Sequence, residues 1–193
     1  MQVEDLAIPD NVQALLAARI DQLEKGLRRT LQLASIIGRS FYRRILYWAM
    51  EVKTSLDEHL TALQRVELIR VAAQVPELEY TFRHEMTRDV ACQSILRRQR
   101  RRYHRRVGEA LETLFPERLE ELAPQLDYHF YEGRDDERAL KYYVMAGDAA
   151  ARLYANEEAA GHYGRALEMA RELNDHQAEA RLLRNLELLR PYL

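Results

Sequence analysis

The chain has few of the residues that crosslink or interrupt secondary structure. It contains a single cysteine, Cys92, which excludes a disulfide bond within the chain. Only seven glycines and five prolines occur among 193 residues, whereas leucine, alanine, arginine and glutamate are abundant. Because these abundant residues favour helices, the composition predicts a mainly α-helical protein with one small β element.

Signals for a membrane or for secretion are also missing. No apolar run approaches the ~20 residues that a helix needs to cross a bilayer. Residues 1–5 lack the charged and then apolar pattern of a secretion signal. Together with the single cysteine, these absences predict a cytoplasmic protein that does not bind membranes. The formal net charge of −2 gives no general attraction to nucleic acid.

The sequence carries no motif of a common catalytic or metal site. It has no G-x-x-x-x-G-K-[ST] loop for phosphates, no H-E-x-x-H and no cysteine cluster. The only two glycines that lie close together, Gly161 and Gly164, have no phosphate-binding lysine beside them. We therefore expect a chain that is not an enzyme by itself, binds no metal and holds no cofactor of its own.

Hydrophobic periodicity predicts the elements of the first part of the chain. Helical stripes indicate one helix from Asp10 that ends at Gly26 and a second over residues 27–37. A fourth is expected to begin at Thr54 or Ser55 and to end near Arg65. Between them, Ser40 is the expected cap of a short third helix that buries Phe41 and Trp48. The period then changes to two at residues 68–72 and 78–82, which predicts a two-stranded hairpin. Several helices followed by such a hairpin are typical of a winged helix.

His84 stands where the second predicted strand gives way to a helix. The start of a helix exposes unpaired backbone N–H groups and attracts anions, and a histidine there can add a further donor. His84 is thus a candidate for sensing a phosphate group. The alternative is that it only caps the helix or faces solvent.

The helix predicted after that one is rich in arginine. It carries seven arginines within ten residues, namely Arg97, Arg98, Arg100, Arg101, Arg102, Arg105 and Arg106. Such a run is a candidate basic interaction face, and the alternative is an ordinary solvated helix face. Phe115 and Pro116 are expected to end this helix.

Alanine and tyrosine recur at fixed offsets in the last third of the chain. Two matching sets, with one additional glycine, are candidates for close packing between helices: Ala139, Tyr143, Ala146 and Gly147, then Ala159, Tyr163 and Ala166. This pattern resembles tetratricopeptide repeats, although the sets lie 20 residues apart instead of about 34. We therefore predict a winged-helix domain over residues 1–120 and tetratricopeptide-like helical hairpins over 121–193. Because such arrays normally have about three or more repeats, the chain is expected to be a piece of a longer array.

The nine residues from Arg83 to Ala91 resemble the M-H-D stretch of STAND-type signal-transduction NTPases, with Arg83 in place of Met and Glu85 in place of Asp. The run from Cys92 to Leu111 is similar to the bacterial branch in which an ATPase is fused to a class III nucleotide cyclase or a transcriptional regulator. This resemblance implies that His84 contacts the β-phosphate of ADP held by a neighbouring ATPase module. It implies that ATP or ADP and Mg²⁺ belong to that module of the same polypeptide.

Two functions compete on these observations. The first is a non-catalytic regulatory segment of a STAND-type ATPase, in which the winged helix closes over the nucleotide and the helical repeats bind a protein partner or signal. The second is a DNA-binding winged-helix transcriptional regulator. A DNA-reading helix needs basic and amide side chains, but the helix over 55–65 begins with Asp57 and Glu58. Nucleic acid is therefore not an expected partner.

Overall fold

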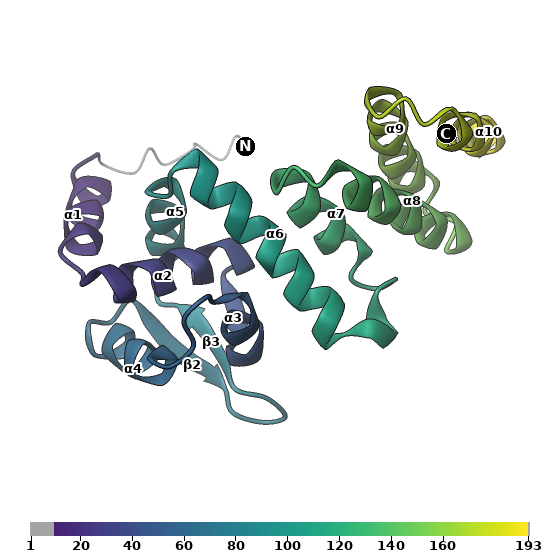
Figure 1. Cartoon of the computed structure of the whole chain (residues 1–193). Coiled ribbons are helices and arrows are strands. Elements are labelled where there is room, and N and C mark those ends of the chain that lie inside the picture. Colours follow the sequence, from purple (N-terminus) through teal and green to yellow (C-terminus); the bar gives the residue numbers. More distant parts are fainter. Residues whose placement is uncertain (1–9, 193) are drawn as a thin grey trace, which may run out of the picture. The chain divides into compact units, whose positions relative to one another are not determined.

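A computed structural model describes residues 10–192, apart from the side chains of Asp10 and Asn11. Within this range the chain forms ten α-helices and one three-stranded antiparallel sheet, which confirms the predicted mainly helical class (Figure 1). The chain divides into two compact units, Met1–Tyr103 and His104–Leu193. The division falls inside a single helix, α6 (Arg97–Leu114). The domain boundary predicted after residue 120 stays a prediction.

The helices of the first unit lie close to the predicted positions: α1 (Asp10–Asp21), α2 (Lys25–Ile37), α3 (Arg43–Ala49), α4 (Leu56–Arg65) and α5 (Glu85–Gln93). The expectation that Gly26 ends the first helix is wrong. Gly26 lies in the first turn of α2, where its amide donates to the side chain of Glu24 at 3.1 Å. Glu24 therefore starts α2, because a carboxylate at a helix N-terminus satisfies amides that have no partner in the helix.

The sheet contains a strand that periodicity did not reveal. Its strands are β1 (Ser40–Tyr42), β2 (Ile69–Ala73) and β3 (Glu79–Phe82), in the order β1-β3-β2. The predicted cap role of Ser40 is wrong, since Ser40 pairs with Thr81 in β1 and α3 begins only at Arg43. The predicted two-stranded hairpin therefore gains a third strand that precedes it by many residues.

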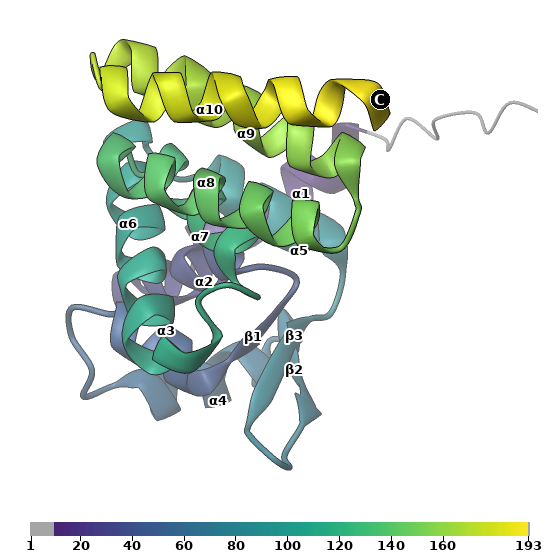
Figure 2. The same cartoon turned by 90° about the vertical axis from the view of Figure 1, so that its right-hand side faces the viewer.

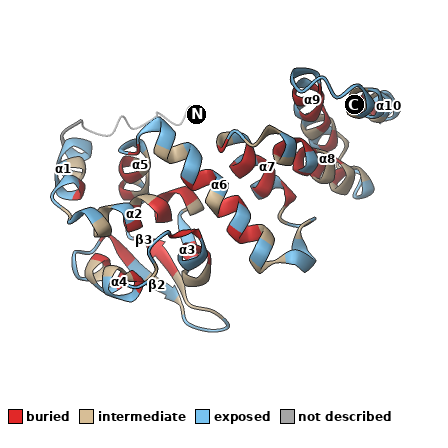
Figure 3. Cartoon of the chain, viewed as in Figure 1, coloured by how far each residue is buried: buried red, intermediate tan, exposed pale blue. Residues whose placement is uncertain are grey.

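Aromatic side chains of this sheet form the centre of the first unit. Phe41 is 2% exposed, and its ring stacks on Tyr80 at 5.9 Å and meets the edge of Phe82 at 5.9 Å. Trp48, expected to be buried beside Phe41, is instead 46% exposed. Burial follows the inner faces of the helices and strands (Figure 3). Helices α2, α3 and α4 complete the core with Leu31, Leu46, Leu56, Leu60 and Leu63.

The second unit is helical throughout its described residues. After α6 ends at Leu114, as Phe115 and Pro116 predicted, it contains a short 3-10 turn (Pro116–Arg118) and then α7 (Ala123–Glu132), α8 (Asp136–Arg152), α9 (Asn156–Glu172) and α10 (His176–Leu189), followed by a final 3-10 turn (Arg190–Tyr192). Consecutive helices pack on each other, and α8, α9 and α10 are seen as neighbours in Figure 2. Their core combines large side chains such as Phe130 and Tyr142 with many alanines.

Three similar turns join these helices at a spacing of 20 residues. Each turn places a non-glycine residue in the left-handed region, with φ of 56° at Arg134, 60° at Tyr154 and 57° at Asn174. In each, the amide of the next residue donates to a carbonyl near the end of the preceding helix, at 2.8–3.0 Å. Such bonds satisfy carbonyl groups that the helix leaves unpaired. The 20-residue offset is therefore one 17-residue helix plus one connection.

Candidate functional site around His84 and along α6

His84 lies at the N-cap position of α5, between β3 and the helix, as predicted. Its backbone is extended, with φ −134° and ψ 139°, and its carbonyl accepts a hydrogen bond from the amide of Thr87 at 3.0 Å. The imidazole is exposed and makes no capping hydrogen bond. Thr87 and Ala91 are buried and fix α5 behind it. The backbone of His84 is therefore held between β3 and α5, and its ring is accessible from solvent.

Charged side chains surround this helix start. Arg83 pairs with Glu67 at 3.1 Å, and Arg39 lies 4.0 Å from Glu85 in the first turn of α5. The carbonyl of Arg39 accepts from the amide of Phe82 at 3.0 Å, which places Arg39 beside the end of β3. Both ion pairs are exposed and contribute little to stability. Two guanidinium groups therefore lie near the start of α5, each beside a carboxylate.

The seven arginines of α6 do not form one uniform face. Arg100 donates to the carbonyl of Cys92 at 2.9 Å, and Arg102 pairs with Glu51 at 3.3 Å. Arg105 donates to the carbonyls of Gly133 and Arg134 at 3.2 and 3.1 Å and lies 3.7 Å from the carboxylate of Asp135. Arg100, Arg102 and Arg105 therefore contact neighbouring segments, and Arg106 is partly buried.

The other three arginines are exposed, and within residues 10–192 they make no ion pair or side-chain hydrogen bond: Arg97, Arg98 and Arg101. Because residues three and four apart are neighbours on a helix, Arg101 adjoins both Arg98 and Arg97, and the three form one strip through Arg101. We call it the free arginine strip. Leu96, which is 80% exposed, precedes it. The candidate basic face is therefore narrower than the sequence predicted.

Replacing Arg97, Arg98 and Arg101 with glutamine together is expected to remove most of any weak binding to duplex DNA. A plot of log affinity against log salt has a negative slope, and its magnitude should decrease by about 3, because each lost phosphate contact removes about 0.9. Fluorescence anisotropy across a salt series measures both quantities. Arg102→Gln is the matched control, since its guanidinium already pairs with Glu51. An equal loss of binding in this control would contradict the distinction between the three unpaired arginines and the paired ones.

Acidic side chains occupy the first turn of helix α4. Arg43 donates two hydrogen bonds to Asp57 in its first turn, both at 2.7 Å, and this bidentate contact holds the pKa of Asp57 below its usual value. Gln64 donates to the carbonyl of Leu60 in its own helix at 3.2 Å. The start of α4 therefore presents carboxylates, which repel a phosphate backbone. No described contact of α4 favours the DNA-binding alternative.

All seven predicted packing residues of the second unit are buried, and they lie on two consecutive helices. Ala139, Tyr143, Ala146 and Gly147 belong to α8, whereas Ala159, Tyr163 and Ala166 belong to α9. The two sets therefore face each other across one helix pair instead of marking equivalent helices of two hairpins. At their centre the ring of Tyr163 covers Gly147, where an added Cβ would lie 2.6 Å from the ring.

Tyr163 is fixed at both ends of its side chain. Its ring is 3% exposed, and its hydroxyl donates to Asp148 at 2.7 Å. Burial and this hydrogen bond raise the pKa of Tyr163 to about 12. Arg181 of α10 also pairs with Asp148, at 2.7 Å. One carboxylate of α8 thereby connects side chains from α9 and α10.

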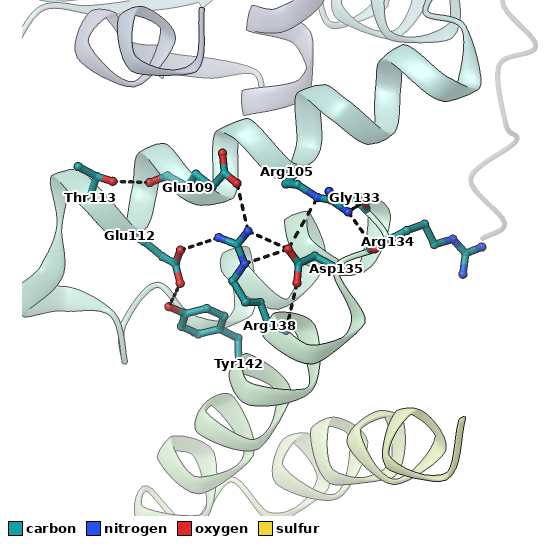
Figure 4. Close-up of polar contacts among 9 residues, drawn as sticks. All are labelled: Arg105, Glu109, Glu112, Thr113, Gly133, Arg134, Asp135, Arg138 and Tyr142. Carbon is teal, nitrogen blue, oxygen red and sulfur yellow. Dashed lines mark hydrogen bonds and ion pairs between the residues drawn. The ribbon is translucent and has the colours of Figure 1, made fainter. Parts of the chain in front are cut away.

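A polar network centred on Arg138 was not predicted from the sequence (Figure 4). Arg138 of α8 contacts Glu109 at 3.0 Å, Glu112 at 3.1 Å and Asp135 at 2.8 Å, and its guanidinium lies 4.4 Å from the ring centre of Phe130. Burial would lower the pKa of Arg138, but the hydrogen bonds to these carboxylates outweigh burial and raise it. The network joins the second half of α6 to the start of α8.

A buried histidine pair also escaped sequence analysis. The Nδ1 atoms of His104 on α6 and His129 on α7 lie 3.1 Å apart, and both side chains are almost fully buried. Burial, followed by the neighbouring His104, lowers the pKa of His129 to about 3. His129 is therefore neutral at physiological pH. Helical spacing alone gives no signal for such a pair, because its members come from different helices.

Comparison with protein-family models, with curated proteins and with solved structures found no match to this chain. Among the described residues, no three His, Cys, Asp or Glu side chains are grouped so that they could hold a metal ion. Over residues 10–192 no helix combines the length and the apolar character required to span a bilayer.

Proposed function

We propose that this chain is a non-catalytic regulatory and interaction segment of a STAND-type ATPase. In this proposal the first unit is a winged helix that closes over ADP held by an ATPase module of the same polypeptide. The second unit is a set of tetratricopeptide-like hairpins that binds a protein partner or signal. The nucleotide and Mg²⁺ belong to the ATPase module, which would supply the phosphate-binding loop that this sequence lacks.

The observation that carries the proposal is the position of His84. It follows the central strand of a three-stranded sheet, opens a helix and points a ring with no capping role toward solvent. Backbone amides at a helix start already favour an anion, and an imidazole donor adjacent to them extends that preference. A residue in this place supports contact with a phosphate of a neighbouring module better than it supports a purely structural role.

In the protein that contains the ATPase module, His84→Ala is expected to speed ADP release by roughly 10- to 150-fold. This range corresponds to one hydrogen bond to a charged acceptor, about 1.5–3 kcal/mol. The closed state loses the same free energy, so signalling should become less dependent on the stimulus. Stopped-flow release of a fluorescent ADP analogue measures the rate.

His176→Ala is the matched control, because the side chain of His176 is 87% exposed on α10 and far along the sequence from His84. This control should leave ADP release unchanged. The thermal unfolding of the His84→Ala chain itself should also stay close to that of the original chain, since the imidazole makes no capping hydrogen bond. An unaltered ADP release rate combined with a large loss of stability would assign His84 a structural role and overturn the proposal.

A further inference from the structure

Two side-chain atoms in the second unit are buried with no hydrogen bond of good geometry. Asp127 of α7 has a side chain that is 5% exposed, and His162 of α9 has one that is 15% exposed. The Oδ2 atom of Asp127 and the Nδ1 atom of His162 are both inaccessible and lack a hydrogen-bond partner of good geometry. These two atoms lie 3.3 Å apart. Each is therefore the nearest available partner of the other.

Groups from all three neighbouring helices enclose the pair. On α8, the ring of Tyr143 lies 6.3 Å from the ring of His162 and is itself 4% exposed. On α9, Glu158 lies 3.9 Å from Nε2 of His162, and Arg165 acts on both members electrostatically. On α7, Tyr131 packs edge-on against Tyr143. The two facing atoms are inaccessible to solvent in these surroundings.

We propose that Asp127 and His162 form a proton-operated clasp between α7 and α9, closed when the two side chains share one proton and loosened when that proton is lost or a second one is gained. With one proton, one atom donates and the other accepts, so both buried groups are satisfied. With none, the carboxylate is left charged at a buried position. With two, both facing atoms carry protons and neither accepts. The clasp connects two helices that are not consecutive, so it sets their separation, and it is independent of the role of His84.

The two side chains favour opening of the clasp at opposite ends of the pH range. Burial raises the pKa of Asp127 from 3.8 to about 7, although Arg165 and the backbone amide of Tyr128 oppose this shift. Its contribution to the closed state is present below 3.8 and is lost as pH rises through about 7. Burial lowers the pKa of His162 below 6.5, although Glu158 opposes the shift. Its contribution is present above 6.5 and is lost as pH falls through the lowered value.

Single variants should therefore show opposite pH dependence. In His162→Gln, opening of α9 should increase about tenfold between pH 6 and pH 8, because only the ionisation of the Asp127 carboxyl group remains. In Asp127→Asn, opening should decrease over the same range, by no more than about fourfold, because only the ionisation of the imidazole remains. Amide hydrogen exchange in α9, corrected for the intrinsic rate, measures opening. His176→Gln is the control and should follow the original chain.

A measurement on the original chain keeps the test decisive if either variant fails to fold. The carboxyl carbon of Asp127 and the ring protons of His162, followed by NMR, should report a shared titration, with Asp127 ionising near 7. Independent titrations near 4 for Asp127 and near 6.5 for His162 would overturn the clasp. The same pH dependence of α9 exchange in both variants and in the original chain would also overturn it.

Discussion

Replacing Arg138 with methionine is expected to lower the free energy of unfolding by about 3 kcal/mol. The substitution keeps much of the side-chain volume but leaves the carboxylates of Glu109 and Glu112 without their cation. Asp135 keeps its longer contact with Arg105, at 3.7 Å. Removing one partner of a buried ion pair costs about 3–5 kcal/mol. The lower end applies here, because the side chain of Arg138 is 33% exposed and solvent weakens the interaction. Urea unfolding followed by circular dichroism measures the loss.

Two further variants test whether the loss of stability comes from the Arg138 network or from removal of any positive charge. Arg138→Lys should recover part of the loss, since it restores the charge but not the planar donor geometry that reaches three carboxylates. Arg171→Met removes an exposed arginine that pairs with Glu179 at 2.7 Å, and it should change stability by no more than about 0.5 kcal/mol. Equal losses for Arg138→Met and Arg171→Met would show that the network has no special importance.

Gly147→Ala is expected to destabilise the second unit by about 3 kcal/mol, even though alanine is the better helix former. The new Cβ would lie 2.6 Å from two ring carbons of Tyr163. The ring has no room to move, because it is buried and its hydroxyl is bound to Asp148. Overpacking of this kind costs about 1–3 kcal/mol. Thermal unfolding and urea unfolding both measure the change.

The neighbouring helix offers a matched control of opposite sign. Gly161 and Gly164 lie inside α9, and an added Cβ at either position meets no atom within 4 Å. Gly161→Ala and Gly164→Ala should therefore each stabilise the chain by about 0.5–1 kcal/mol, which is the ordinary difference in helix propensity. A stabilising Gly147→Ala would mean that α8 and α9 do not approach each other as closely as described.

Local sequence signals predicted the helices and the hairpin, but they did not predict β1. The hydrophobic period identified α4 and α5 because each spans enough residues to show a stripe. Ser40–Tyr42 is three residues long, directly precedes a helix and pairs with a strand many residues later. A serine at that place reads equally well as a helix cap. The strand is therefore determined by long-range pairing, which periodicity does not detect.

The candidate sites also differ in whether they depend on adjacent or on distant segments of the chain. The position of His84 follows from two adjacent elements, so the change of period was enough to predict it. The environments of Arg138 and Asp127 depend on residues from other helices that come together only on packing. The arginines of α6 can be counted in the sequence, but only tertiary contacts distinguish Arg101 from Arg102, which pairs with Glu51. Pairings between distant segments are the part of this chain that composition and spacing do not determine.

The equal spacing of the three turns at Arg134, Tyr154 and Asn174 constrains how this region can change in length. Each residue advances an α-helix by about 100°, so deleting one residue within α8 or α9 would rotate every later side chain away from its partner. Tyr163 would then no longer face Gly147, and the following turn would leave its position. Duplication of a whole pair of helices would keep every register. Evolution of this region should therefore proceed by gain or loss of complete helical units, with smaller insertions restricted to the connections.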